Sequence, residues 1–275
     1  MPLNDLNAIK KRITAATQTS KITRTMELIA SSRLQRGKLL LAGYQDWFQH
    51  MREASKCLPD SCFAPPDYEP GGGRRVYIVF AGSKGLSGAY TPNLMQYAKP
   101  IVSGHFVLAV GSAGDDYFPD ARSFFPEEIP SPDNAGAIVR AAKTIYEDMS
   151  RDESDDNGAS EVCMVYMVYT RGSKQVTEQL FPLVRREQYD ADVIVEPSAR
   201  LLFPVLLDEY AEAIVYEAHL QAFISEQVAR VSAMDSATRN ADDIIASLQA
   251  DYNRIRQTSI TQEIITVSNA ARGGD

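Results

Sequence analysis

Proline and glycine are both missing between Pro204 and Gly273, the longest such gap in the chain. An uninterrupted helix over 205–271 would be roughly 100 Å long at about 1.5 Å per residue. Its apolar residues recur with a mean spacing of 3.5 from Leu220 to Ile255, which is the coiled-coil period. A helix this long needs a second long helix to cover its stripe. The stripe consists of Leu220, Ile224, Val228, Val231, Met234, Ala237, Ala241, Ile245, Leu248, Tyr252 and Ile255.

Long apolar runs and cysteines are also scarce. No run of 18 apolar residues occurs, so the sequence predicts no membrane span. Basic residues at 10–12 stand where the apolar core of a signal peptide would lie. The three cysteines are too few for a disulfide framework and favour a reducing cytosol. Cys57 and Cys62 have no second ligand pair nearby, so we expect no metal site.

A recognisable active site is missing as well. His50, His105 and His219 are far apart in the sequence, and none adjoins a serine or cysteine nucleophile pattern. The carboxylate pairs at 115–116 and 155–156 are better explained as solvated turns than as an acid–base pair. We therefore expect no catalytic residue and no cofactor in this chain.

Charge is distributed unevenly. The whole chain has a net charge of −8, yet residues 1–56 contain ten Lys or Arg and four Asp or Glu. A basic arm can indicate nucleic-acid binding, but no aromatic residue interleaves with the basic ones before Tyr44. A basic helix lying beside acidic neighbours is the preferred interpretation, without nucleic acid as a partner.

The N-terminal segment supplies the second long helix. It runs without proline from Asp5 to about Leu58, and Gly37 and Gly43 allow a bend. We expect it to pack antiparallel against 205–271. Between Thr14 and Ser20 the pattern thins to small and polar residues, which either pack closely or face solvent. The apolar positions are Leu6, Ile9, Ile13, Ile22, Met26, Ile29, Leu34, Leu41, Tyr44, Phe48 and Met51.

The middle of the chain has the sequence pattern of an α/β domain. Apolar runs at 76–80, 106–110 and 162–169 predict buried strands, 175–183 predicts a fourth strand, and 91–97 and 133–149 predict helices. The expected fold class is α/β, a long antiparallel coiled coil of the N- and C-terminal helices with an inserted small open Rossmann-like domain. The expected divisions are an N-terminal shaft helix (1–58), a Pro- and Gly-rich linker (59–74), an α/β foot domain (75–200) and a C-terminal shaft helix (201–275).

A glycine turn follows the first strand and precedes a helix, which is where phosphate-binding loops occur. It reads Gly82-Ser83-Lys84-Gly85-Leu86-Ser87-Gly88. The turn lacks the closing Gly-Lys-Ser/Thr of a P-loop, and its glycines are three apart instead of following G-x-G-x-x-G. A plain tight turn is the preferred interpretation, and phosphate binding is the alternative.

Two segments near opposite ends of the chain resemble one family. They are Ser20-Lys21-Ile22-Thr23-Arg24-Thr25-Met26-Glu27-Leu28-Ile29-Ala30-Ser31-Ser32 and Tyr252-Asn253-Arg254-Ile255-Arg256-Gln257-Thr258-Ser259-Ile260-Thr261-Gln262-Glu263-Ile264. Both resemble the gamma subunit of the rotary F-type ATP synthase, as do 225–230 and the glycine turn. The resemblance covers the whole chain. It implies that the paired helices form a central shaft inside a ring of alternating alpha and beta subunits.

The resemblance also implies roles for particular residues. Arg256 and Gln257 match positions that hydrogen-bond to a beta subunit and act as a catch. Met26 matches a position that, through Arg230, Gln257 and Thr261, tunes the coupling of rotation to catalysis.

The remaining expectations concern the membrane side of such a complex. Glu196 matches a foot residue that meets the membrane c-ring, and the epsilon subunit is a further implied partner. The implied location is peripheral, at the cytoplasmic face of the cell membrane, in a complex coupled to protons or sodium ions.

This chain departs from the family's pattern in two places. The family's glycine turn usually reads Asp-Arg-Gly-Leu-Cys-Gly-Gly, and residues 83–89 replace that sequence here. The family's C-terminus is usually apolar, whereas this chain ends in Arg272-Gly273-Gly274-Asp275. The alternative function is a coiled-coil scaffold with a phosphate-binding α/β head.

Overall fold

The computed structural model describes residues 2–56, 58, 63, 75–83, 85–126, 129–152, 164–182, 196 and 198–272. The predicted linker at 59–74, the three cysteines, Lys84, the acidic loop beyond Asp152 and the tail beyond Arg272 lie outside these residues, apart from Phe63 in the linker. Within the described part, no helix has the length and apolarity that crossing a bilayer requires.

The chain forms two compact units. The first, here called the helical unit, contains residues 1–30 and 230–275, and the second, the sheet unit, contains residues 31–229. Helix α1 (Pro2–Gly43) and helix α5 (Ala199–Arg272) each contribute to both units. Helix α5 begins six residues before the predicted start at Val205, and it continues through Pro204 in its second turn, where the proline removes one backbone hydrogen-bond donor from the helix.

The predicted N-terminal helix is interrupted once. It is divided at Tyr44 into α1 and α2 (Gln45–Ser55), next to the glycine at position 43 where a bend was expected. The backbone bonds from Tyr44 N to Leu40 O and from Phe48 N to Tyr44 O, each 2.9 Å, continue across the interruption. The ring of Tyr44 packs edge-on against Tyr216 of α5, with centroids 5.0 Å apart. The interruption is therefore a local kink fixed by aromatic packing.

Gly37 lies inside α1 and permits close packing. A Cβ at this position would lie 3.1 Å from atoms of Phe223 and Ile224 on α5. Gly37 of α1 faces Phe223 of α5, and Tyr44 faces Tyr216. The two helices therefore run antiparallel in the sheet unit, as predicted.

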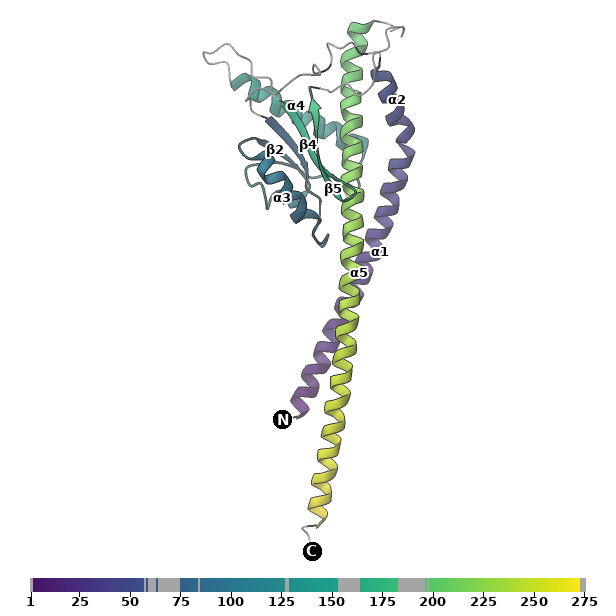
Figure 1. The fold of residues 1–275 in the computed structure, drawn as a ribbon, viewed down its shortest axis with the longest axis vertical. Coiled ribbons are helices and arrows are strands. Elements are labelled where there is room, and N and C mark those ends of the chain that lie inside the picture. The colour runs from purple at the N-terminus through teal and green to yellow at the C-terminus, as the bar shows by residue number, and fades with distance from the viewer. Residues whose placement is uncertain are drawn as a thin grey trace. The chain divides into compact units, whose positions relative to one another are not determined.

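The sheet is mixed, with the strand order β3-β2-β1-β4-β5; strands β2, β4 and β5 are labelled in Figure 1. Strands β1 (Arg75–Phe80), β2 (Phe106–Val110), β3 (Arg122–Phe124) and β4 (Met164–Arg171) are parallel, and β5 (Lys174–Phe181) pairs antiparallel with β4. Four of these strands were predicted. The sequence did not predict β3, which has only three residues and follows the short 3-10 helix η2 (Ser112–Gly114).

Both faces of the sheet are covered by helices. Val76, Ile78 and Phe80 of β1 pack in one core with α4 (Pro132–Asp152), α5 and α2. The alternate residues Tyr77 and Val79 pack in a second core against α3 (Tyr90–Val102). Because every other residue of β1 points to each face, the continuous apolar run noted in the sequence serves two cores.

Helix α4 is joined to α5 by salt bridges as well as by apolar packing. Arg140 Nη1 lies 3.9 Å from Glu212 Oε1, and Lys143 Nζ pairs with Asp208. At the N-terminus of α4, Ser131 Oγ accepts a 3.3 Å hydrogen bond from Asn134 N and so caps the helix. Pro132 takes the first helical position.

Candidate functional site

In the helical unit, the seam between α1 and α5 is partly polar. Thr23 Oγ1 and Thr238 Oγ1 are 2.7 Å apart across the seam, and Ser20 Oγ donates to Asp242 Oδ1 at 2.7 Å. Since 20 faces 242 while 23 faces 238, the helices are antiparallel here too. Thr238 also donates to Met234 O at 2.8 Å, so its buried hydroxyl is satisfied within its own helix. Small hydroxyl residues therefore let these two helices approach closely.

The apolar stripe predicted for the N-terminal helix is wrong in this part of α1, because the seam here is partly polar. Ile22, Met26 and Ile29 were expected to form part of that stripe, but they are 59%, 39% and 44% exposed. Ala30, one residue further on, is buried instead. The three exposed side chains are spaced i, i+4, i+7 and thus form an apolar stripe along a second face of α1.

The stripe predicted for the C-terminal helix is largely confirmed. Met234, Ala241 and Leu248 are buried, and Ile245, Tyr252 and Ile255 are half-buried. Val228 is the exception, because it is 48% exposed.

The C-terminal end of α5 carries a second exposed apolar surface. Every described side chain from Ile260 to Asn269 is exposed, and these include Ile264, Ile265 and Val267. Among the side chains of α5 whose burial is described, up to Asn269, the last buried one is that of Ser259.

Arg256 and Gln257 lie outside the seam. Both side chains are exposed, whereas Tyr252 and Ile255 in the seam are half-buried. The hydroxyl of Thr261, also exposed, donates to Gln257 O at 2.9 Å. The contact of Arg256 and Gln257 with a beta subunit stays a prediction.

The residues assigned to coupling do not form one cluster. Met26 lies one turn beyond Thr23, which faces Thr238. Gln257 is roughly 28 Å further along α5 than Thr238, at about 1.5 Å per residue. Arg230 is only 7% exposed, unlike Met26 and Gln257. Any coupling between Met26 and Gln257 therefore acts over several helical turns.

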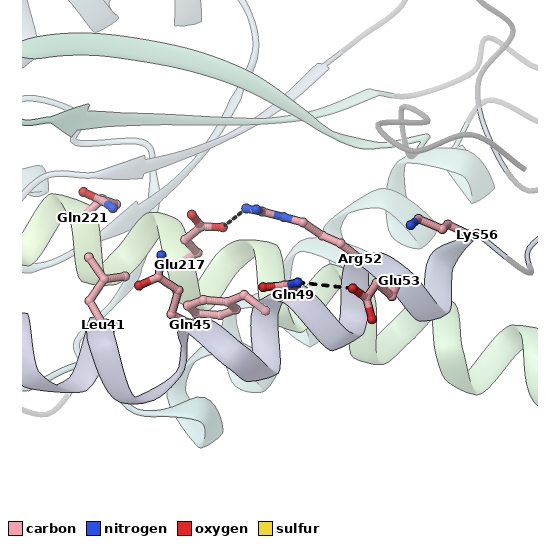
Figure 2. Close-up of a pocket in the computed structure, with 9 residues that line it drawn as sticks. Leu41, Gln45, Gln49, Arg52, Glu53, Lys56, Glu217 and Gln221 are labelled. Carbon is pink, nitrogen blue, oxygen red and sulfur yellow. Dashed lines mark hydrogen bonds and ion pairs between the residues drawn. The ribbon is translucent and has the colours of Figure 1, made fainter.

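The sheet unit contains a polar groove that the sequence did not reveal (Figure 2). It has a volume of about 430 Å³ and lies between α2 and α5. Arg52 Nη2 bonds to Glu217 Oε2 at 2.8 Å across the groove, and Gln49 Nε2 donates to Glu53 Oε1 at 3.2 Å along α2. The Arg52–Glu217 ion pair ties α2 to α5 beside the aromatic kink. The groove is lined by Leu41, Gln45, Phe48, Gln49, Arg52, Glu53, Lys56, Glu217 and Gln221.

The predicted foot residue Glu196 is exposed.

The glycine turn lies at the carboxyl end of β1, where Gly82, Leu86 and Gly88 have positive φ values of 86°, 66° and 58°. Gly85 is exposed. Gly82 O accepts a 3.2 Å bond from Ala113 N, which connects the turn to η2. This bond fixes the Gly82 end of the turn within the sheet unit.

His219 of α5 packs beneath this turn. Its ring lies 5.3 Å from the ring of Phe80, and it is 7% exposed. Among the described residues its Nδ1 has no hydrogen-bond partner. Burial lowers the pKa of His219 to about 4, so the imidazole is neutral at physiological pH.

This burial predicts a pH dependence of stability. The unfolded chain takes up a proton on His219 near pH 6.5, whereas the folded chain does so only near pH 4. Unfolding therefore becomes easier as the pH falls through this window, by on the order of 3 kcal/mol in total. His219→Phe, which keeps an aromatic ring beside Phe80, should lose less stability between pH 7 and pH 5 in urea titrations. Equal losses in both proteins would contradict the assignment.

Comparisons with known proteins agree with this architecture. A family model described as ATP synthase matches residues 5–272. The ATP synthase gamma chain of Ruminiclostridium cellulolyticum is 31% identical, with 98% of each chain covered. That of Clostridium perfringens is also 31% identical, with 96% of each chain covered.

Solved structures show the same fold at lower identity. A chain of the Euglena gracilis mitochondrial ATP synthase OSCP/F1/c-ring structure in rotational state 3 has a TM-score of 0.69 and 14% identity, covering 98% of this chain and 94% of that one. A chain of the rotor from the same organism in rotational state 1 has a TM-score of 0.63 and 12% identity, covering 94% and 99%. The long N- and C-terminal helices, the mixed sheet between them and the whole-length match place this chain in the family of ATP synthase gamma chains.

Proposed function

We propose that this chain is the central rotor shaft of an F-type ATP synthase and transmits torque between an ion-driven membrane ring and ATP chemistry on the beta subunits. The observation that carries the proposal is the apolar surface that faces outward in the helical unit. One part is the stripe of Ile22, Met26 and Ile29, and the other is the end of α5 beyond Ser259. Apolar surface of this extent is typical of a protein interface. A ring of alpha and beta subunits would cover it.

The shaft would act by being asymmetric. The apolar stripe belongs to α1, whereas Arg256 and Gln257 belong to α5 and lie further along the pair. Rotation would present each face to every beta subunit in turn and shift that subunit between states of different nucleotide affinity. Met26, Arg230 and Thr261 would tune this coupling. The chain itself needs no catalytic residue for this role.

The finer assignments belong to the same proposal. The shaft helices (1–58 and 201–275) form an antiparallel coiled coil, and a Rossmann-like foot (75–200) follows the linker (59–74). Glu196, exposed three residues before the start of α5, contacts the membrane c-ring, and the epsilon subunit is a further partner. The complex is peripheral to the cytoplasmic face of the membrane.

Purification of the native complex tests this function. A tag on this chain should recover two larger nucleotide-binding subunits, each in molar excess over the tagged chain. A stable homodimer that binds nucleotide without those subunits would instead support the coiled-coil scaffold with a phosphate-binding head.

A further inference from the structure

An open cavity lies at the amino ends of β2 and β3. It is bordered by the two segments that lead into these parallel strands, and its lining residues fall in the ranges 99–107 and 117–121. The first segment turns back from the end of α3 through Gly104, whose φ is 79°. The volume of the cavity is about 650 Å³. Cavities of about 300–1,000 Å³ are usual for small-molecule sites.

The walls of the cavity are largely apolar and aromatic. Phe106, the first residue of β2, is 42% exposed. Tyr117 and Phe118 are half-buried and pack against the core between the sheet and α3, which holds their rings in place. Aromatic rings gain energy from offset or edge-on contact with another ring beyond the area that they bury. These walls therefore favour a planar aromatic ligand over an aliphatic one.

His105 lines the cavity and has an unused hydrogen-bonding group. Its Nδ1 is buried and has no hydrogen-bond partner in the described part of the chain. Its ring is packed against that of Tyr77, with centroids 5.5 Å apart. Burial and, to a smaller extent, the charge of Arg75 lower the pKa of His105, so the imidazole is neutral at physiological pH. A buried polar atom without a partner is unfavourable, and a ligand in the cavity can supply the missing bond.

Positive charge predominates around the cavity. Lys99 Nζ lies over the ring of Tyr117, 5.2 Å from its centroid, and none of the described carboxylates forms a salt bridge with it. An ammonium group has three donors, so contact with one ring leaves donors for an anion. Arg75 adds a second positive charge beside His105. These two charges outweigh the single carboxylate at the rim, Asp120, and the C-terminus of α3.

We propose that this cavity binds a small planar aromatic molecule that carries an anionic substituent. The ring packs against Phe106 and Tyr117, the anionic group pairs with Lys99, and a polar group on the ring bonds to His105. The proposal goes beyond the rotor function and does not depend on it, since all of these residues lie within the sheet unit.

The chain contains only three histidines, which makes a specific test possible. Full-length protein labelled with carbon-13 at histidine is titrated with 6-hydroxy-2-naphthoate and observed by NMR. The imidazole signal of His105, identified by its loss in His105→Gln, should move with a dissociation constant of about 1 mM or lower. The signals of His50 and His219 should stay in place. Two comparison compounds, 2-naphthol without the carboxylate and cyclohexanecarboxylate without the aromatic ring, should each bind at least about threefold more weakly.

Matched substitutions separate the charged part of the site from the aromatic part. Lys99→Gln should weaken the binding of 6-hydroxy-2-naphthoate about threefold and leave that of 2-naphthol unchanged. Lys99 is exposed, so this change leaves the fold intact. Phe106→Ser should weaken the binding of both compounds. Lys174→Gln, which removes an exposed lysine from β5 at the other edge of the sheet, should change neither.

An unmoved His105 signal at several millimolar 6-hydroxy-2-naphthoate would overturn the proposal. Equal movement of all three histidine signals would also overturn it, because that result indicates non-specific binding. If the compound does not bind to the free chain but assembly with other subunits shifts the His105 signal, a protein partner covers the cavity and the assignment to a small ligand is wrong.

Discussion

Arg256→Ala is expected to lower ATP turnover of the assembled complex by about tenfold or more, while the isolated chain stays folded. The guanidinium is exposed on α5 and presents a planar fork of five donors, which suits a carboxylate-bearing loop. Loss of a well-formed charge-assisted hydrogen bond costs about 1.5–3 kcal/mol, which corresponds to roughly tenfold or more in rate if the contact forms in the rate-limiting state. Steady-state hydrolysis by the reconstituted complex measures this effect.

The chain provides a matched control two residues away. Arg254 is also exposed, but its Nη2 pairs with Asp251 Oδ1 of the same helix at 3.0 Å. Arg254→Ala removes the same charge from the same region and should change turnover less than about twofold, as expected for a surface ion pair. A turnover within twofold of wild type for Arg256→Ala would show that Arg256 faces solvent and makes no catch.

Leu248→Asp is expected to destabilise the helical unit by several kcal/mol. Leu248 is 7% exposed in the seam, and the substitution places an unpaired carboxylate there in addition to removing apolar contacts. Thermal unfolding of the isolated chain, followed by circular dichroism at 222 nm, should show a lower midpoint and reduced helix content.

Ile244→Asp is the control for this substitution. Ile244 precedes the half-buried Ile245 on α5 but is 52% exposed. The same chemical change at position 244 should therefore shift the midpoint little. Equal shifts for the two variants would mean that the seam does not lie along the predicted face.

The long C-terminal helix could be predicted well because one face of it is apolar over many turns. Met234, Ala241 and Leu248 repeat every seven residues, and all three are buried. The mean spacing of 3.5 already identifies such a seam. Val228 could not be placed, since an apolar residue at the edge of a stripe fits either face.

The facing surface of α1 could not be predicted by the same reasoning. There Ala30 is buried and Thr23 is half-buried, whereas the apolar residues Ile22 and Met26 are exposed. Apolar periodicity finds a buried face only when apolar residues are buried and polar residues are not. A surface that binds another protein exposes apolar residues in the isolated chain. The wrong prediction for α1 is therefore itself a sign of an interface.

The contact between Gly82 and Glu226 was also hidden in the sequence. The two residues are 144 positions apart, and neither position signals the other. Only the fold brings the Glu226 carboxylate against Gly82. Strand β3 escaped prediction for a different reason, because its three residues are too few to show a period of two.

Observation of rotation tests the central claim most directly. The chain would be assembled with the alpha and beta subunits of its own complex, the ring would be fixed to a surface, and a probe would be attached to the α/β part of this chain. On addition of ATP, the account predicts unidirectional stepwise rotation of the probe that stops when ATP is exhausted. ATP hydrolysis by the same complexes with a stationary probe would contradict it.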